Sequence, residues 1–113
     1  MLPLAALLLV QAPTPEAQKI ETLIRAVEGL KDATFLRNGS EHSPQAAGEH
    51  LRLKLRNAGK RVNSAADFIQ RCGSRSSSTG ELYRIRFKNG REVLCSDFLW
   101  TELKRIDPAS AGK

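Results

Sequence analysis

The sequence is short of aromatic residues and cysteine, and it contains no apolar run long enough to span a membrane. Aromatic side chains make up 5% and charged side chains 27% of its 113 residues. This composition excludes a disordered or fibrous chain and is typical of one small globular domain. The two cysteines, Cys72 and Cys95, do not form a Cys-x-x-Cys pair. The sequence therefore predicts neither a thioredoxin-type redox site nor a cysteine zinc site.

The longest apolar run stands at the N-terminus, from Met1 to Ala12, and carries no charge. It falls short of the about 20 apolar residues that a bilayer requires. It is long enough for the hydrophobic region of a secretory signal, and it ends in the small-x-small pattern Val10-Gln11-Ala12. The basic leader of such signals is missing, which indicates a start placed too late. A buried N-terminal helix is the alternative, which Pro3 and the break at Pro13-Thr14-Pro15 disfavour.

We therefore expect an exported protein, periplasmic or secreted, with no transmembrane segment in its mature form. Cleavage is expected after Ala12, with Ala17 as a second possible site. Residues 1–17 are interpreted as a signal-peptide-like segment and linker, residues 18–107 as the domain, and residues 108–113 as a tail. In an exported protein, Cys72 and Cys95 predict one disulfide, which closes a loop of about 23 residues and contributes about 3 kcal/mol. The alternative is two buried thiols in a cytoplasmic protein.

Apolar spacing and capping residues predict four helices. The first contains residues 20–27 and ends at Gly29. The second begins at Ser43-Pro44 and ends at residues 57–59, and the third lies between Ser64 and Gly73. The last is capped by Ser96 or Asp97 and ends at Pro108. Residues 32–37 are partly β-like and run into the Asn38-Gly39 turn.

The clearest β signal is Asn89-Gly90, flanked by residues 82–87 and 92–95. With a two-residue loop, Ile85 would face Leu94 and Arg84 would face Cys95. The side chains expected to face inward are Tyr83, Ile85, Phe87 and Leu94. The predicted fold class is a small single α+β domain, with about four helices packed against one two-stranded antiparallel hairpin.

The possible chemistry of the chain is narrow. Glu41, His42, Glu49 and His50 lack the i, i+4 spacing of a helical zinc site, so we predict no metal and no cofactor. A hydrolytic site would combine His50 with Ser76, Ser77 or Ser78, but the sequence has no Gly-x-Ser-x-Gly motif.

The net charge is +6 with a pI near 9.8, which favours acidic partners or serves solubility alone. Nucleic acid is disfavoured as the partner for two reasons. Few exposed aromatic side chains are expected that could stack on bases, and an exported protein would be kept apart from cellular nucleic acid.

Polar and basic side chains from several segments are expected to converge and to bind an anionic or carbonyl-rich ligand. The predicted binding residues are Arg37, Asn38, His50, Lys54, Ser76, Ser77, Tyr83, Arg84 and Arg86. The alternative is that they satisfy one another as a network that braces a small domain.

Several of these residues belong to motifs that resemble the YfeK-like bacterial envelope proteins. The matching motifs are Phe35-Leu-Arg-Asn-Gly-Ser40, His50-Leu51 with Lys54, Ser64-Ala65 with Phe68-Ile69, Ser74-Arg-Ser-Ser77 with Gly80, and Tyr83 with Ile85-Arg86. The resemblance covers about residues 20–105. It implies an exported, periplasmic protein of Gram-negative bacteria, in a family without an established activity or cofactor.

The chain departs from the family pattern at several positions. The family often has an aromatic residue at the position of His42 or next to it. It also has a proline before the motif tyrosine, where this chain has Leu82. Family cysteines would fall at residues 33–34 and at Phe87, so the predicted disulfide does not come from the resemblance.

Together, these features predict a small exported binding protein of the bacterial envelope. Its expected partner is an envelope protein or an anionic envelope component. The alternatives are a small periplasmic enzyme that uses a His50/Ser77 patch, and an inhibitor or immunity-type protein.

Overall fold

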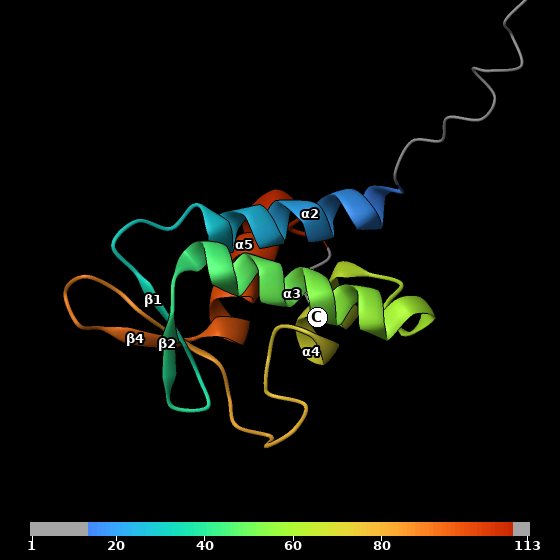
Figure 1. Ribbon diagram of the computed structural model, residues 1–113. Helices are drawn as coiled ribbons and strands as arrows, with labels where there is room; N and C mark the ends of the chain where they lie inside the picture. Colours follow the sequence, from blue (N-terminus) through green and yellow to red (C-terminus); the bar gives the residue numbers. More distant parts are fainter. Residues whose placement is uncertain (1–13, 110–113) are drawn as a thin grey trace, which may run out of the picture.

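The computed structural model describes residues 14–109, which form four α-helices and a four-stranded sheet. In chain order the elements are α2 (Pro15–Glu28), β1 (Thr34–Arg37), β2 (Ser40–His42), α3 (Pro44–Ala58), the 3-10 helix η1 (Gly59–Arg61), α4 (Ala65–Arg71), β3 (Arg84–Arg86), β4 (Glu92–Leu94) and α5 (Cys95–Ile106). Helices α2 and α3 run alongside each other, and the strands gather at one end of the helical layer (Figure 1). The α+β class and the four helices are confirmed.

The helix starts follow from local capping. Ser43 Oγ accepts a hydrogen bond from Ala46 N at 3.0 Å, and Ser64 Oγ accepts one from Asp67 N at 3.0 Å, as the sequence predicts. Thr14 does the same for α2, with Pro15 in the first turn. Helix α2 therefore begins at Pro15, within the segment interpreted from the sequence as a linker.

The predicted cap of the last helix is also wrong. Helix α5 begins at Cys95, directly after strand β4, and no side chain caps it. Cys95 N instead donates to the backbone oxygen of Tyr83 at 2.9 Å. Its first backbone donor is therefore satisfied across the sheet, not by a side chain of Ser96 or Asp97.

The sheet has four antiparallel strands in the order β2-β1-β3-β4, so the prediction of a single hairpin is wrong. Asn38 and Gly39 both have positive φ, 53° and 79°, and they join β1 to β2 in a two-residue turn. Strand β1 then pairs with β3, with Phe35 opposite Ile85. Residues 34–37, part of the segment predicted to be partly β-like, therefore form one of the two central strands of the sheet.

The register of the second hairpin differs from the prediction by one residue. Phe87 N donates to Arg91 O and Gly90 N donates to Phe87 O, both at 2.8 Å, so residues 88–90 form a three-residue loop. Gly90 has φ 89°, which is typical of a turn followed by a glycine bulge. As a result Ile85 faces Val93, not Leu94, and Arg84 faces Leu94, not Cys95.

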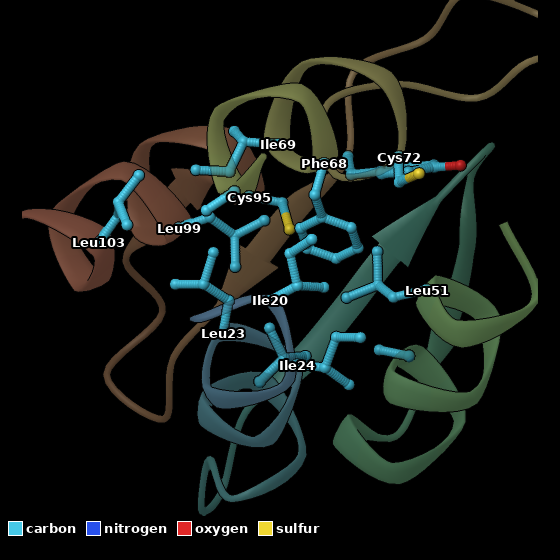
Figure 2. Packing of buried hydrophobic residues seen from close by; sticks show 14 of the residues in the cluster. Ile20, Leu23, Ile24, Leu51, Phe68, Ile69, Cys72, Cys95, Leu99 and Leu103 are labelled. Carbon is cyan, nitrogen blue, oxygen red and sulfur yellow. The ribbon is translucent and has the colours of Figure 1, made fainter. Parts of the chain in front are cut away.

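The core lies between the helices and one face of the sheet (Figure 2). Its buried members are Ile20, Leu23, Ile24, Val27, Phe35, Ala47, Leu51, Ala65, Phe68, Ile69, Cys72, Tyr83, Ile85, Cys95, Leu99 and Leu103. Burying each large side chain contributes about 1.5–3 kcal/mol. Of the four hairpin side chains expected to face inward, Tyr83 and Ile85 are buried, whereas Phe87 and Leu94 are half-buried.

Helices α2 and α3 are also joined by charge. Arg52 on α3 donates to both carboxylate oxygens of Glu21, at 2.7 and 3.0 Å, and to both of Glu28, at 3.1 and 3.2 Å. The Arg52 guanidinium, followed by Arg25, lowers the pKa of Glu21 to about 2. Gly48 faces Glu28 at this contact, and its missing side chain leaves room for the carboxylate.

The predicted disulfide is not formed in the structure. Cys72 and Cys95 are both buried free thiols. Figure 2 shows their sulfur atoms apart from each other, with the ring of Phe68 between them in that view. Cys72 follows the end of α4, whereas Cys95 is the first residue of α5. Burial raises the pKa of Cys72, and it raises that of Cys95 to about 12.

The two predicted cleavage sites lie differently with respect to the fold. Ala12 is outside the described residues. Ala17 lies in the first turn of α2, where its N–H donates to Thr14 Oγ1 at 3.1 Å. Glu16 Oε1 accepts from Ala65 N at 2.8 Å, so cleavage after Ala17 would remove both a helix cap and a tie to α4. Within residues 14–109, no helix is long and apolar enough to cross a membrane.

Candidate functional site

Tyr83 is the centre of a polar cluster between helix α3 and the sheet. Its side chain is 1% exposed, and its ring centroid lies 5.3 Å from that of Phe35. Lys54 Nζ donates to Tyr83 Oη at 2.9 Å, and His50 Nε2 lies 3.0 Å from the same oxygen. His50 and Lys54 are four residues apart on α3 and therefore share one helix face. The predicted convergence of these three residues is present in the structure.

The surroundings hold His50 neutral. Burial, and then the charges of Arg37, Lys54 and His42, lower the pKa of His50 to about 4. Burial likewise lowers the pKa of Lys54 and raises that of Tyr83. At neutral pH the cluster therefore presents a neutral imidazole and a neutral phenol beside cationic groups.

Two nitrogens next to His50 have no partner. Arg37 on β1 and His42 on β2 are diagonal neighbours on the sheet face that carries Phe35. Arg37 Nε and His42 Nε2 are both buried and make no hydrogen bond within residues 14–109. We define the polar cluster as Arg37, His42, His50, Lys54 and Tyr83. Because buried polar atoms normally have a partner, the Arg37 Nε–H donor leaves the cluster short of an acceptor.

Asn38 and Ser76 brace a loop instead. Ser76 is 5% exposed, and its Oγ accepts from Asn38 Nδ2 at 3.1 Å and from two backbone amides of its own loop. Thr79 Oγ1 donates to Asn38 Oδ1 at 2.6 Å. The loop is closed by Gly80 N, which donates to Ser76 O at 2.9 Å. For Asn38 and Ser76 the geometry matches the alternative of a bracing network, because their side-chain donors and acceptors already bond to each other and to the loop.

Ser77 is exposed at the rim of an open groove between α3, α4 and the loop. We call this the basic groove. Its volume is about 330 Å³, and it is lined by Ala58 and by the polar residues Lys54, Asn57, Arg61, Gln70, Arg71 and Ser77. Lys54 is common to the groove and the polar cluster. Within the described residues no hydrogen bond joins Ser76 or Ser77 to His50, whose Nε2 contacts Tyr83 Oη. The structure therefore does not bring together the predicted serine–histidine pair.

Arg84 and Arg86 lie away from this site. Side chains alternate along a strand, so they occupy the sheet face opposite Tyr83 and Ile85. Arg84 is exposed, and Arg86 Nη2 pairs with Glu41 at 2.8 Å. Neither reaches the polar cluster.

The binding residues predicted from the sequence do not include His42, Arg61 or Arg71. His42 had a signal in the Asn38-Gly39 turn, because a two-residue turn places residues 37 and 42 on one face of the hairpin. Arg61 and Arg71 had none, since only the packing of α4 beside the end of α3 brings them together. Within the described range no three His, Cys, Asp or Glu side chains are grouped to hold a metal ion.

The fold and the site define a small α+β domain with a cationic surface, and the family follows from comparison with known proteins. The chain belongs to the Family of unknown function (DUF5329), whose match covers residues 14–107. It is similar to the "Uncharacterized protein YfeK" of Salmonella typhimurium, with 43% identity over 68 residues. That match covers 60% of this chain and 57% of the relative, so the chain spans little more than half of it. No solved structure matches. The resemblance to the YfeK-like proteins is thereby confirmed.

Proposed function

We propose that this chain is an exported binding domain of the bacterial cell envelope that captures an anionic envelope component at the polar cluster. Export is supported by the apolar leader and by the resemblance to envelope proteins. One observation carries the ligand chemistry. The buried Arg37 Nε lacks an acceptor in a cluster whose charges, on Arg37 and Lys54, are cationic. A carboxylate or phosphate oxygen supplies the acceptor that this donor lacks.

Several features favour binding over hydrolysis. His50 contacts a tyrosine hydroxyl, not a serine, and the charges that shift its pKa are cationic. A general base of the serine-hydrolase type needs a nearby hydroxyl and a carboxylate that orients it. The polar cluster offers donors and positive charge instead, which suit capture of an anion.

The test is photo-crosslinking in a native envelope extract. A photoreactive residue is placed at position 77, beside Lys54, and in a separate variant at Thr22, which is exposed on α2. We expect an adduct from position 77 alone, with an anionic envelope component recovered chemically unchanged. Equal adducts from both positions, or a converted component, would contradict the proposal.

A matched pair of charge variants sharpens this test. Arg37→Gln keeps an amide donor but removes the charge from the cluster, and we expect it to reduce the position-77 adduct at least about tenfold. Arg25→Gln removes an exposed charge on α2, whose ion pair with Glu21 lies away from the site, and should leave the adduct unchanged. If the adduct is a protein that this domain inhibits, the inhibitor alternative replaces the proposal.

A further inference from the structure

The basic groove gathers three cationic side chains from three separate elements. Lys54 comes from α3, Arg61 from η1 and Arg71 from the last turn of α4. None of the three forms an ion pair within residues 14–109. No carboxylate is among the lining side chains, and the other polar groups are two amides and the hydroxyl of Ser77.

The helix ends at the groove account for part of this charge. Helices α3 and α4 both end beside it, and each C-terminus carries at most about −0.5 of an elementary charge. Arg61 caps α3 directly, with Nε donating to Ala58 O at 3.1 Å and Nη2 to Asn57 O at 3.2 Å. Three cations against two half charges leave about +2. A phosphate ester carrying about −1.5 to −2 matches that excess better than a single carboxylate does.

The donors needed for a phosphate are also free. Lys54 has three ammonium protons, of which two are used by Arg75 O at 2.8 Å and Tyr83 Oη at 2.9 Å. Arg61 uses two of its five N–H groups on the end of α3, and the side chain of Arg71 makes no hydrogen bond in the described part of the chain. One ammonium proton and most of two guanidinium groups therefore remain for a ligand.

We propose that the basic groove binds a phosphate ester group of the envelope ligand, with Lys54 shared between the groove and the polar cluster. This rests on the proposed function and names its ligand class. Arg61 and Arg71 hold phosphate oxygens through their guanidinium forks, and Ser77 donates its hydroxyl from the rim. A lipid head group and a phosphorylated soluble glycan both present this chemistry.

The test measures binding of glycerol phosphate to the full-length protein, with acetate and a poly-glutamate peptide as carboxylate probes. We expect glycerol phosphate to bind more tightly than acetate or poly-glutamate. Arg61→Gln and Arg71→Gln should each weaken its binding about tenfold, the loss of one charge-assisted contact. Arg56→Gln is the matched control, because Arg56 is an exposed cation of α3 that does not line the groove. It should leave the affinity unchanged.

Flotation with vesicles distinguishes the two sources of phosphate. Binding to phosphatidylglycerol vesicles that Arg71→Gln abolishes identifies a lipid head group; binding of glycerol phosphate without flotation identifies a soluble ester. Unfolding curves of each variant confirm the fold, and Arg71→Gln removes no internal hydrogen bond.

Three outcomes would overturn the groove assignment: no binding of glycerol phosphate, acetate or poly-glutamate binding as tightly, or equal losses in Arg56→Gln and Arg71→Gln. The results that would contradict the groove assignment differ from those that would contradict the proposed function. If position 77 still gives its adduct and Arg37→Gln removes it, while Arg61→Gln and Arg71→Gln change nothing, anion capture stands and the phosphate groove falls.

Discussion

Lys54 approaches Tyr83 in two ways. Its Nζ donates to Tyr83 Oη at 2.9 Å and also lies 4.8 Å from the centroid of the same ring. Tyr83 belongs to the buried core, whereas Lys54 opens onto the basic groove. One pair of residues therefore joins the core, helix α3 and the candidate binding surface.

This pair predicts energetic coupling. Tyr83→Phe and Lys54→Met should each lower the free energy of unfolding by about 1–2 kcal/mol, because each removes a partly buried hydrogen-bond partner. Together they should cost about 1 kcal/mol less than the sum, since both remove the same contact. Urea unfolding of the four proteins measures the coupling. Additive costs would show that the contact contributes nothing.

His50 predicts a dependence of stability on pH. Its ring takes up a proton near pH 6.5 in the unfolded chain but only near its folded pKa of about 4. Between these values the unfolded state binds more protons, so the free energy of unfolding falls as the pH drops from about 6.5 to 4. We expect a loss of about 2 kcal/mol, reduced from the full shift because the ring is partly exposed. The measurement is urea unfolding at several pH values.

His50→Gln is the control for that pH dependence. Glutamine retains a hydrogen-bonding group but does not titrate, so the fall in this window should be about 2 kcal/mol smaller. Glu21, with its pKa of about 2, loses its contribution as the pH falls below 4.5, so the two effects overlap only between pH 4.5 and about 4. Identical slopes in the two proteins would contradict the assignment.

Two glycines predict opposite tolerance of a methyl group. A Cβ at Gly73 would lie 2.5 Å from Leu99 Cδ1, inside the core, so Gly73→Ala should cost about 1–3 kcal/mol. At Gly48 the Cβ would meet only the Glu28 side chain, which can swing into solvent. The lost contact with Arg52 and the gain in helix propensity then roughly cancel. Equal midpoints of urea unfolding for the two variants would refute this difference.

The cysteines predict a labelling pattern. Without reductant, the folded protein should react slowly with an alkylating reagent at pH 8, because burial keeps both thiols protonated. After unfolding in denaturant, intact mass should show two labels. A protein that takes labels only after reduction would carry the disulfide that the structure lacks.

Local chemistry predicted much of this fold, and the two Asn-Gly turns show where it fails. Asn38-Gly39 forms a two-residue loop, whereas Asn89-Gly90 forms part of a three-residue loop with only the glycine at positive φ. The same dipeptide permits both, and the choice depends on pairing across the sheet. The register therefore could not be obtained from the turn alone. Caps such as Ser43 and Ser64 were predicted because they need only their own helix.

The candidate site likewise contains residues that local spacing predicts and residues that only tertiary packing brings together. His50 and Lys54 were predicted together because helical spacing fixes their shared face, and Tyr83 followed from its place in the inward set. Arg71 reaches the groove through packing of α4, which no spacing in the chain reveals. Arg84 and Arg86 were expected at the site, but strand alternation and the added β1 place them on the other face of the sheet.

The short outer strands have a consequence for aggregation. Strands β2 and β4 are the two edges of the sheet, each three residues long, and they carry Glu41 and Glu92. An edge of this length exposes few unpaired backbone groups, and a strand added to it would meet a carboxylate. The sheet is thereby a poor template for another chain, even though its central strands are assembled from segments far apart in the sequence.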